Sequence, residues 1–215
     1  MTAPDDQLVL AATLTQRTKQ LCVGLEHGEA EILELVTPVT AELLRWWFAE
    51  DACQSRAFNF HAGQRQAILN LIVAHEVLDS PDLADLYRRV CPDALLQGDR
   101  FDEISEGKHA HPKYCLKMAT GTGKTWVLQA LLIWQMLNRT VAQKEGSNDP
   151  RFTPHFLIIA PGLIVYERLL DAFLGREGGD GWRHFETSDV AVCAELFVPP
   201  AYREQVEQFI RGNVC

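Results

Sequence analysis

The chain has 215 residues, 47% of them hydrophobic and 23% charged, which is enough to bury the core of one domain, or of one domain with a helical extension. This composition excludes a disordered chain, and no apolar run approaches the roughly eighteen residues of a membrane-spanning helix. The formal net charge of −9 excludes a protein that attracts nucleic acid through a global positive field. Contact with DNA or RNA therefore needs a local surface or parts of a larger protein.

Two features predict a cytoplasmic protein without membrane attachment. Six cysteines are scattered along the chain with no C-x-x-C pair, as expected of reduced, buried thiols. The N-terminal residues Met1–Asp6 have neither the basic flank nor the apolar core of a secretory signal.

Residues 1–57 are predicted to form an N-terminal helical extension. Thr37 followed by Pro38 offers an N-cap and a proline at the first helical position. An apolar stripe at helical spacing follows, which predicts an amphipathic helix; its members are Val39, Leu43, Leu44 and Trp47. Further along, Ser80-Pro81 is predicted to cap another helix.

The segment Lys117–Thr125 reads K-M-A-T-G-T-G-K-T, between a short apolar run, Tyr114–Leu116, and a strongly apolar segment, Trp126–Leu137. A strand, a glycine-containing loop and a helix in this order are the context of a phosphate-binding loop. Main-chain N–H groups of such a loop and the positive end of the following helix together form an anion site. The sequence therefore predicts a nucleoside triphosphate site.

Each residue type in the loop suits one part of a magnesium–triphosphate complex. Glycine lets the backbone turn tightly without a Cβ in the way of phosphate oxygens. Lys124 is expected to reach the β- and γ-phosphates, and the Thr125 hydroxyl to ligate Mg²⁺. The predicted cofactors are ATP and Mg²⁺, with Lys124 and Thr125 as catalytic residues. The residues expected to cradle the phosphates are Thr120, Gly121, Thr122 and Gly123.

The apolar segments after the loop predict a parallel sheet. Trp126–Leu137 is hydrophobic nearly all round, as in a buried helix. Phe156–Ala160 is an unbroken apolar run of strand length, typical of a parallel strand covered on both faces. Tyr166–Leu174 has helical spacing and ends at Gly175, and Val190–Val198 suits a further strand. We therefore expect an α/β fold, with a partial RecA-like domain over residues 58–215 after the helical region.

Three segments together resemble the motor region of superfamily 2 helicases, in particular type III restriction enzymes and their DEAD/DEAH-like relatives. These segments are Phe60–Ile68, Lys117–Thr125 and Phe156–Val165. The first resembles the glutamine motif, in which Gln64, or alternatively Gln66, would read adenine through its amide. Pro161-Gly162 in the third resembles the motif that holds nucleic-acid phosphates.

The resemblance implies an ATP-dependent helicase or translocase that acts on nucleic acid, most often double-stranded DNA, alongside a methyltransferase or specificity subunit. Such a motor also needs an acidic motif on a later strand and an arginine finger from a second domain. No strand-borne Asp-Glu pair follows Ile159, so we expect a chain truncated before that motif. The chain alone should then hydrolyse ATP poorly or not at all.

Two other functions stay open. A catalytically silent nucleotide-binding module would bind ATP without turnover. A small-molecule phosphotransferase is disfavoured because Met118 stands where the pattern G-x-x-x-x-G-K-[ST] has its first glycine.

Overall fold

The computed structural model describes residues 6–96, 100–105, 107 and 111–213. Helices dominate it. The N-terminal half contains α1 (Asp6–Leu21), η1 (Leu25–His27), α2 (Ile32–Leu35), α3 (Pro38–Phe48), α4 (Glu50–Gln54), α5 (Ala62–Ile72), η2 (Val73–Val77), α6 (Leu83–Val90), η3 (Pro92–Leu96) and α7 (Arg100–Ser105). The second half contains α8 (Lys124–Lys144), α9 (Leu163–Leu174), β1 (Arg176–Glu177), β2 (Arg183–His184), η5 (Phe185–Thr187), α10 (Asp189–Val192), α11 (Ala194–Phe197), η6 (Pro200–Tyr202) and α12 (Arg203–Asn213).

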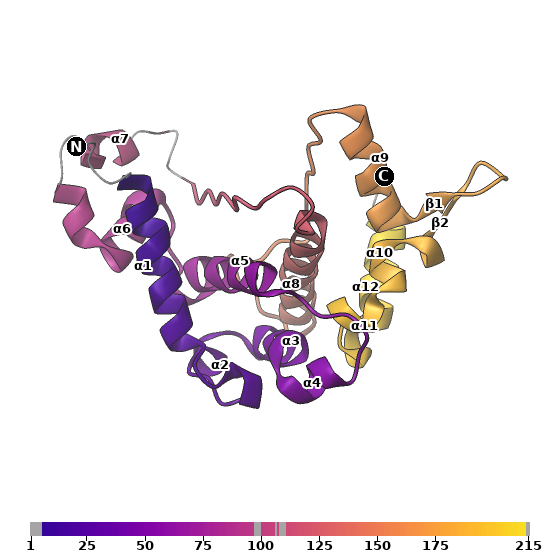
Figure 1. Cartoon of the computed structure of the whole chain (residues 1–215), viewed down its shortest axis with the longest axis horizontal. Helices are drawn as coiled ribbons and strands as arrows, with labels where there is room; N and C mark the ends of the chain where they lie inside the picture. The colour runs from indigo at the N-terminus through magenta and orange to yellow at the C-terminus, as the bar shows by residue number, and fades with distance from the viewer. Residues whose placement is uncertain (1–5, 97–99, 106, 108–110, 214–215) are drawn as a thin grey trace.

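Helix α8 stands in the middle of the molecule (Figure 1). Helices α1, α6 and α7 lie at one end, and α9 to α12 with the projecting β1–β2 hairpin lie at the other. One main hydrophobic cluster runs from Leu21 to Ile210 and includes α3, α5 and α8, so apolar packing crosses the predicted boundary at residue 57. That boundary stays a prediction. None of the described helices combines the length and hydrophobicity needed to cross a lipid bilayer.

The predicted RecA-like parallel sheet is wrong for this structure. Within the described ranges the only strand pairing joins β1 to β2, antiparallel and two residues long on each side. Tyr114–Leu116 and Phe156–Ala160 lie outside any ladder, and Val190–Val198 forms α10 and α11 instead. An apolar run specifies a chain that avoids water, but a ladder also needs neighbouring strands, which the described chain does not place beside these runs.

Local capping signals predicted helix ends more reliably than apolar runs predicted strands. Thr37 is the N-cap of α3 and its hydroxyl accepts a hydrogen bond from the Thr40 N–H, with Pro38 at the first helical position, as predicted. Gly175 ends α9 with φ 86°, again as predicted. The cap of α6 is Asp82 rather than Ser80, because the Asp82 carboxylate accepts from the Asp85 N–H at 2.8 Å.

A buried carboxylate joins three elements at the centre of the fold. Glu76, in the π-helical turn η2, is 1% exposed. Its oxygens accept hydrogen bonds from the Thr37 N–H at 2.5 Å, the Thr40 hydroxyl at 2.8 Å and the Trp134 indole N–H at 3.1 Å. Burial raises the pKa of this carboxyl, and the three donors only partly oppose that rise. The network therefore fixes α3 and α8 against the end of α5.

The carbonyl oxygens of the short helix α11 accept hydrogen bonds from side chains of α3 and from Arg56, which follows α4. The Trp47 indole N–H donates to Phe197 O at 2.9 Å, and the Trp46 indole N–H donates to Glu195 O at 3.0 Å. The Arg56 guanidinium donates to Glu195 O at 3.3 Å and to Leu196 O at 3.4 Å. These donors satisfy carbonyls that a four-residue helix leaves without partners.

Candidate nucleotide-binding site

The loop before α8 has the backbone that a phosphate-binding loop requires. Gly121 has φ 80° and Gly123 has φ 69°, a left-handed conformation that side-chain-bearing residues rarely adopt. Gly123 is the N-cap of α8, so the loop ends at the positive pole of a helix of 21 residues. A Cβ at Gly121 would meet nothing within 4 Å, which leaves that side of the loop open to a ligand.

Lys124 folds back over the loop. Its ammonium group donates to Ala119 O at 2.9 Å and to Met118 O at 3.1 Å, and its side chain is exposed. The Thr122 hydroxyl also donates to Ala119 O, at 2.7 Å. The ammonium thus lies beside the loop, where a phosphate oxygen could replace a carbonyl as its partner.

The Thr125 hydroxyl is a suitable magnesium ligand in its position. Thr125 is the second residue of α8 and is partly exposed. Within the described part of the chain its hydroxyl has no hydrogen-bond partner. An uncommitted oxygen at the start of α8 fits the coordination expected of Mg²⁺, which prefers oxygen ligands and retains several waters.

The stretch of sequence that contains the loop carries positive charge although the whole chain is negative. No Asp or Glu occurs between Glu106 and Glu145, whereas Lys113, Lys117 and Lys124 lie in or near the loop. The first turn of α8 likewise contains no acidic residue. Sequence reasoning based on the total charge of −9 missed this acid-free stretch, which a running count of charge along the chain reveals.

Helix α5 supplies two side chains that contact the loop. The His61 Nε2 lies 2.9 Å from Thr122 O, and the Gln64 Nε2 donates to Gly123 O at 3.2 Å. Gln64 is 3% exposed, and its Oε1 accepts from the His61 N–H at 3.0 Å. Gln66 points elsewhere, because its amide donates to Asn70 Oδ1 at 2.8 Å. The structure therefore brings Gln64, but not Gln66, to the phosphate loop.

The chain that enters the loop is anchored at Tyr114. The Tyr114 hydroxyl lies 3.5 Å from His75 Nδ1, and the two rings meet edge to face. Burial, with the nearby Asp79 charge, raises the pKa of Tyr114 to about 12, so the phenol stays neutral. His75 also packs against Trp134 and Phe152. This aromatic cluster holds the start of the loop against α8.

The nucleic-acid candidates Pro161 and Gly162 lie apart from this constellation. Both are exposed, and Gly162 is the N-cap of α9, with Gly162 O accepting from the Val165 N–H at 3.1 Å. Among the described residues they share no hydrogen bond with the loop.

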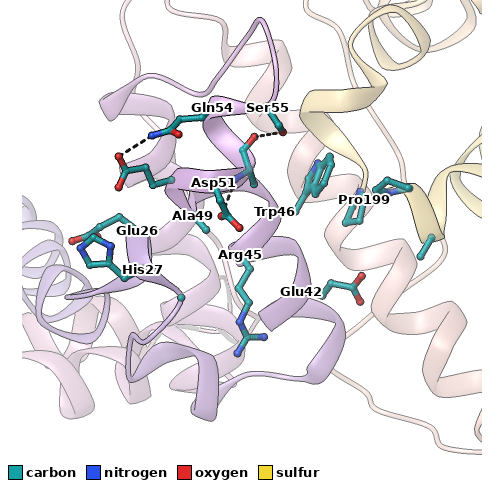
Figure 2. Close-up of a pocket in the computed structure, with 15 residues that line it drawn as sticks. Glu26, His27, Glu42, Arg45, Trp46, Ala49, Asp51, Gln54, Ser55 and Pro199 are labelled. Atoms are coloured by element: carbon teal, nitrogen blue, oxygen red, sulfur yellow. Dashed lines mark hydrogen bonds between the residues drawn. The ribbon is translucent and has the colours of Figure 1, made fainter.

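A cavity of about 1150 Å³ lies between α3, α4 and the segment Pro199–Ala201 (Figure 2). Its lining includes the carboxylates of Glu26, Glu42, Glu50 and Asp51. A triphosphate would be repelled by these charges, so the size of this cavity does not make it the nucleotide site. The loop suits an anion better because it offers main-chain N–H groups, an ammonium and no acid.

Comparison with known families places the chain among the helicase-like ATPase motors. The family model of the type III restriction enzyme res subunit matches residues 57–195, well over half of the chain, and the chain belongs to this family. The resemblance predicted from the three motif segments is therefore confirmed. No curated protein and no solved structure matches the chain.

Proposed function

We propose that this chain binds ATP with Mg²⁺ at the loop Lys117–Thr125, as the ATP-binding part of a nucleic-acid-dependent helicase or DNA translocase. The observation that carries this proposal is the pair of left-handed glycines immediately before the N-terminus of α8, within an acid-free stretch. Membership of the type III restriction family supports the same assignment.

The roles of the loop residues follow from their positions. The main-chain N–H groups of residues 120–123 cradle the phosphates, Lys124 neutralises the β- and γ-phosphates, and Thr125 ligates Mg²⁺. Gln64 contacts adenine through the part of its amide that is free of main-chain contacts, since one N–H and one oxygen lone pair have no partner among the described residues.

The remaining partners are proposed from the family alone. Pro161 and Gly162 contact the phosphates of a nucleic-acid strand, which we take to be double-stranded DNA, and the full assembly includes a methyltransferase or specificity subunit. An exposed turn at the N-terminus of α9 is the kind of surface that positions such phosphates.

Replacement of Lys124 by Ala tests the nucleotide site. We expect a fluorescent ATP analogue to bind Lys124→Ala at least about tenfold more weakly, because a charge-assisted contact to phosphate contributes roughly 1.5–3 kcal/mol. The exposed Lys144 at the other end of α8 provides the matched control, and Lys144→Ala should bind like the wild type. Equal affinity of Lys124→Ala and the wild type would remove the loop from consideration.

A catalytically silent module is the second candidate. It is favoured by one observation: in the described ranges no carboxylate makes a hydrogen bond with the loop. This candidate predicts ATP binding without turnover. Hydrolysis by the chain that accelerates when double-stranded DNA is added would rule it out.

A further inference from the structure

The N-terminus of α5 contacts the phosphate loop through a histidine that no motif assigned. The His61 Nδ1 accepts hydrogen bonds from the Gly63 N–H at 3.1 Å and the Gln64 N–H at 3.3 Å, which makes His61 the N-cap of α5. Gln64 completes a capping box, because its Oε1 accepts from the His61 N–H. The imidazole is therefore held in one orientation by the start of its own helix.

This capping arrangement determines which ring nitrogen carries the proton. A nitrogen that accepts two N–H groups cannot itself be protonated, so the neutral ring carries its hydrogen on Nε2. That N–H points at Thr122 O, 2.9 Å away, and donates to it. Directly beside it, the Gln64 amide donates to Gly123 O at 3.2 Å. Two consecutive carbonyls of the loop thus accept from donors at the start of α5, and Gly123 O also accepts from the Trp126 N–H of α8 at 3.0 Å.

The carbonyls matter because each belongs to a peptide unit whose N–H faces the other way. Fixing Thr122 O and Gly123 O away from the loop's open side directs the N–H groups of Gly123 and Lys124 toward a bound anion. The fit is close: an added Cβ at Gly123 would collide with Gln64 Nε2. The Gln64 amide therefore occupies the space directly beside Gly123.

We propose that His61 is a positioning residue that holds the phosphate loop in its anion-binding conformation by donating its Nε2 hydrogen to Thr122 O. Gln64 supports it through Gly123 O. The inference rests on the proposed function of the loop as a triphosphate site, and it deepens that proposal by explaining how the site is preorganised without a neighbouring sheet.

Two substitutions separate the tether from the helix cap. His61→Asn keeps a good N-cap acceptor for α5 but is too short to reach Thr122 O. Gln64→Glu keeps the capping-box acceptor but loses the donor to Gly123 O. His27→Asn, at an exposed histidine on η1, is the matched control. His61→Ala removes cap and tether together.

We expect His61→Asn to keep the wild-type melting temperature within about 2 °C and to bind triphosphate about fivefold to tenfold more weakly, the effect of one lost hydrogen bond. Gln64→Glu places a carboxylate against Gly123 O at a buried position, so it should weaken binding and also lower the melting temperature. The probe is a fluorescent ATP analogue, displaced in turn by ATP, GTP and inorganic tripolyphosphate. For His61→Asn the weakening should be the same for all three competitors, because the tether acts on the phosphate loop and not on the base.

These experiments separate failure of the proposed positioning role from failure of the proposed nucleotide site. If the wild type binds and Lys124→Ala does not, but His61→Asn binds like the wild type, the positioning role is overturned while the site stands. Loss confined to ATP, with tripolyphosphate unaffected, would also overturn it and assign His61 to the base. If the wild type binds no triphosphate, both the site and the positioning role fail.

Discussion

Gly121 and Gly123 share a left-handed backbone but have different surroundings. Gly121 faces open space, whereas Gly123 lies against the Gln64 amide. The sequence identified both glycines as loop residues from their spacing before Lys124. It could not distinguish them, because the contact with Gln64 joins positions 59 residues apart along the chain.

Alanine at the two positions should therefore have unequal effects. Gly121→Ala adds only the strain of a left-handed alanine, about 1–2 kcal/mol, and should lower the melting temperature by a few degrees. Gly123→Ala adds the same strain and makes Gln64 Nε2 move away, so it should also lose the hydrogen bond to Gly123 O, a further loss of about 0.5–1.5 kcal/mol. Gly179→Ala, at a glycine without left-handed φ or close neighbours, is the control. Melting temperatures are measured by differential scanning fluorimetry. Equal decreases for Gly121→Ala and Gly123→Ala would contradict the contact between Gly123 and Gln64.

His61 is the functional candidate that sequence reasoning passed over. A signal was present, since His61 precedes Gln64 by three residues in the spacing of a capping box. Histidine is not among the residues preferred at N-caps, so that spacing alone does not suggest the assignment. The contact with Thr122 O could be found only in three dimensions.

At the scale of elements, the buried Glu76 network predicts a pH dependence. Burial raises the pKa of Glu76 in the folded state above its ordinary value of 4.5, so the folded protein binds this proton more tightly than the unfolded chain. As pH rises above that ordinary value, the unfolded chain releases the proton first and this group's contribution to stability falls. The fall ends once pH exceeds the folded-state pKa.

Glu76→Gln should remove that slope. Melting temperatures of the wild type and Glu76→Gln are measured from about pH 4 to pH 8. The value of the wild type minus that of the variant should decrease as pH rises, until pH exceeds the folded-state pKa of Glu76. Comparison with the variant cancels oppositely shifted groups such as Asp149, whose pKa is lowered by its hydrogen bonds with Arg151. The melting temperature of Glu29→Gln, which changes an exposed carboxylate, should depend on pH as that of the wild type does. If the melting temperature of Glu76→Gln also changes with pH as that of the wild type does, burial does not raise the pKa of Glu76.

Element boundaries could be predicted where the signal lies in adjacent residues. Thr37 with Pro38 and Gly175 each act on their own helix end, and both predictions were confirmed. The predicted strands failed because strand formation depends on partners elsewhere in the chain. Val190–Val198 shows a different reason: Ser188 caps α10 by accepting from the Ala191 N–H at 3.1 Å, a local signal that outweighs the apolar pattern.

At the scale of the whole molecule, the run Phe156–Ala160, predicted to be a strand covered on both faces, is largely exposed, as is the start of α9 that follows it. Leu157 is 85% exposed and Ile159 is 81% exposed, and Leu163 and Ile164 are each 74% exposed. A cavity of about 420 Å³ lies behind this run, lined by apolar residues of the run, α9 and α12. A concentration of exposed apolar side chains of this kind favours self-association in water.

Acidic substitutions in this run should change association more than stability. Leu157→Glu and Ile159→Glu remove exposed apolar surface and add charge, so light scattering should show less self-association, with melting temperatures within about 2 °C of the wild type. Phe173→Ala, at a 4% exposed side chain of α9, should instead cost about 3–5 kcal/mol. A comparable loss of stability in Leu157→Glu would mean that Leu157 is packed in solution.

Contacts at two levels join α5 with its continuation η2 to α8. One pair of bonds, from His61 and Gln64, lies at the phosphate loop, and the other, from Trp134 to Glu76, lies farther along the helices. Hydrogen bonds at two levels resist sliding of α5 along α8, because such a movement would break the bonds at both levels. A displacement of the loop along the helices is therefore opposed by hydrogen bonds at both levels and not only by those beside the loop.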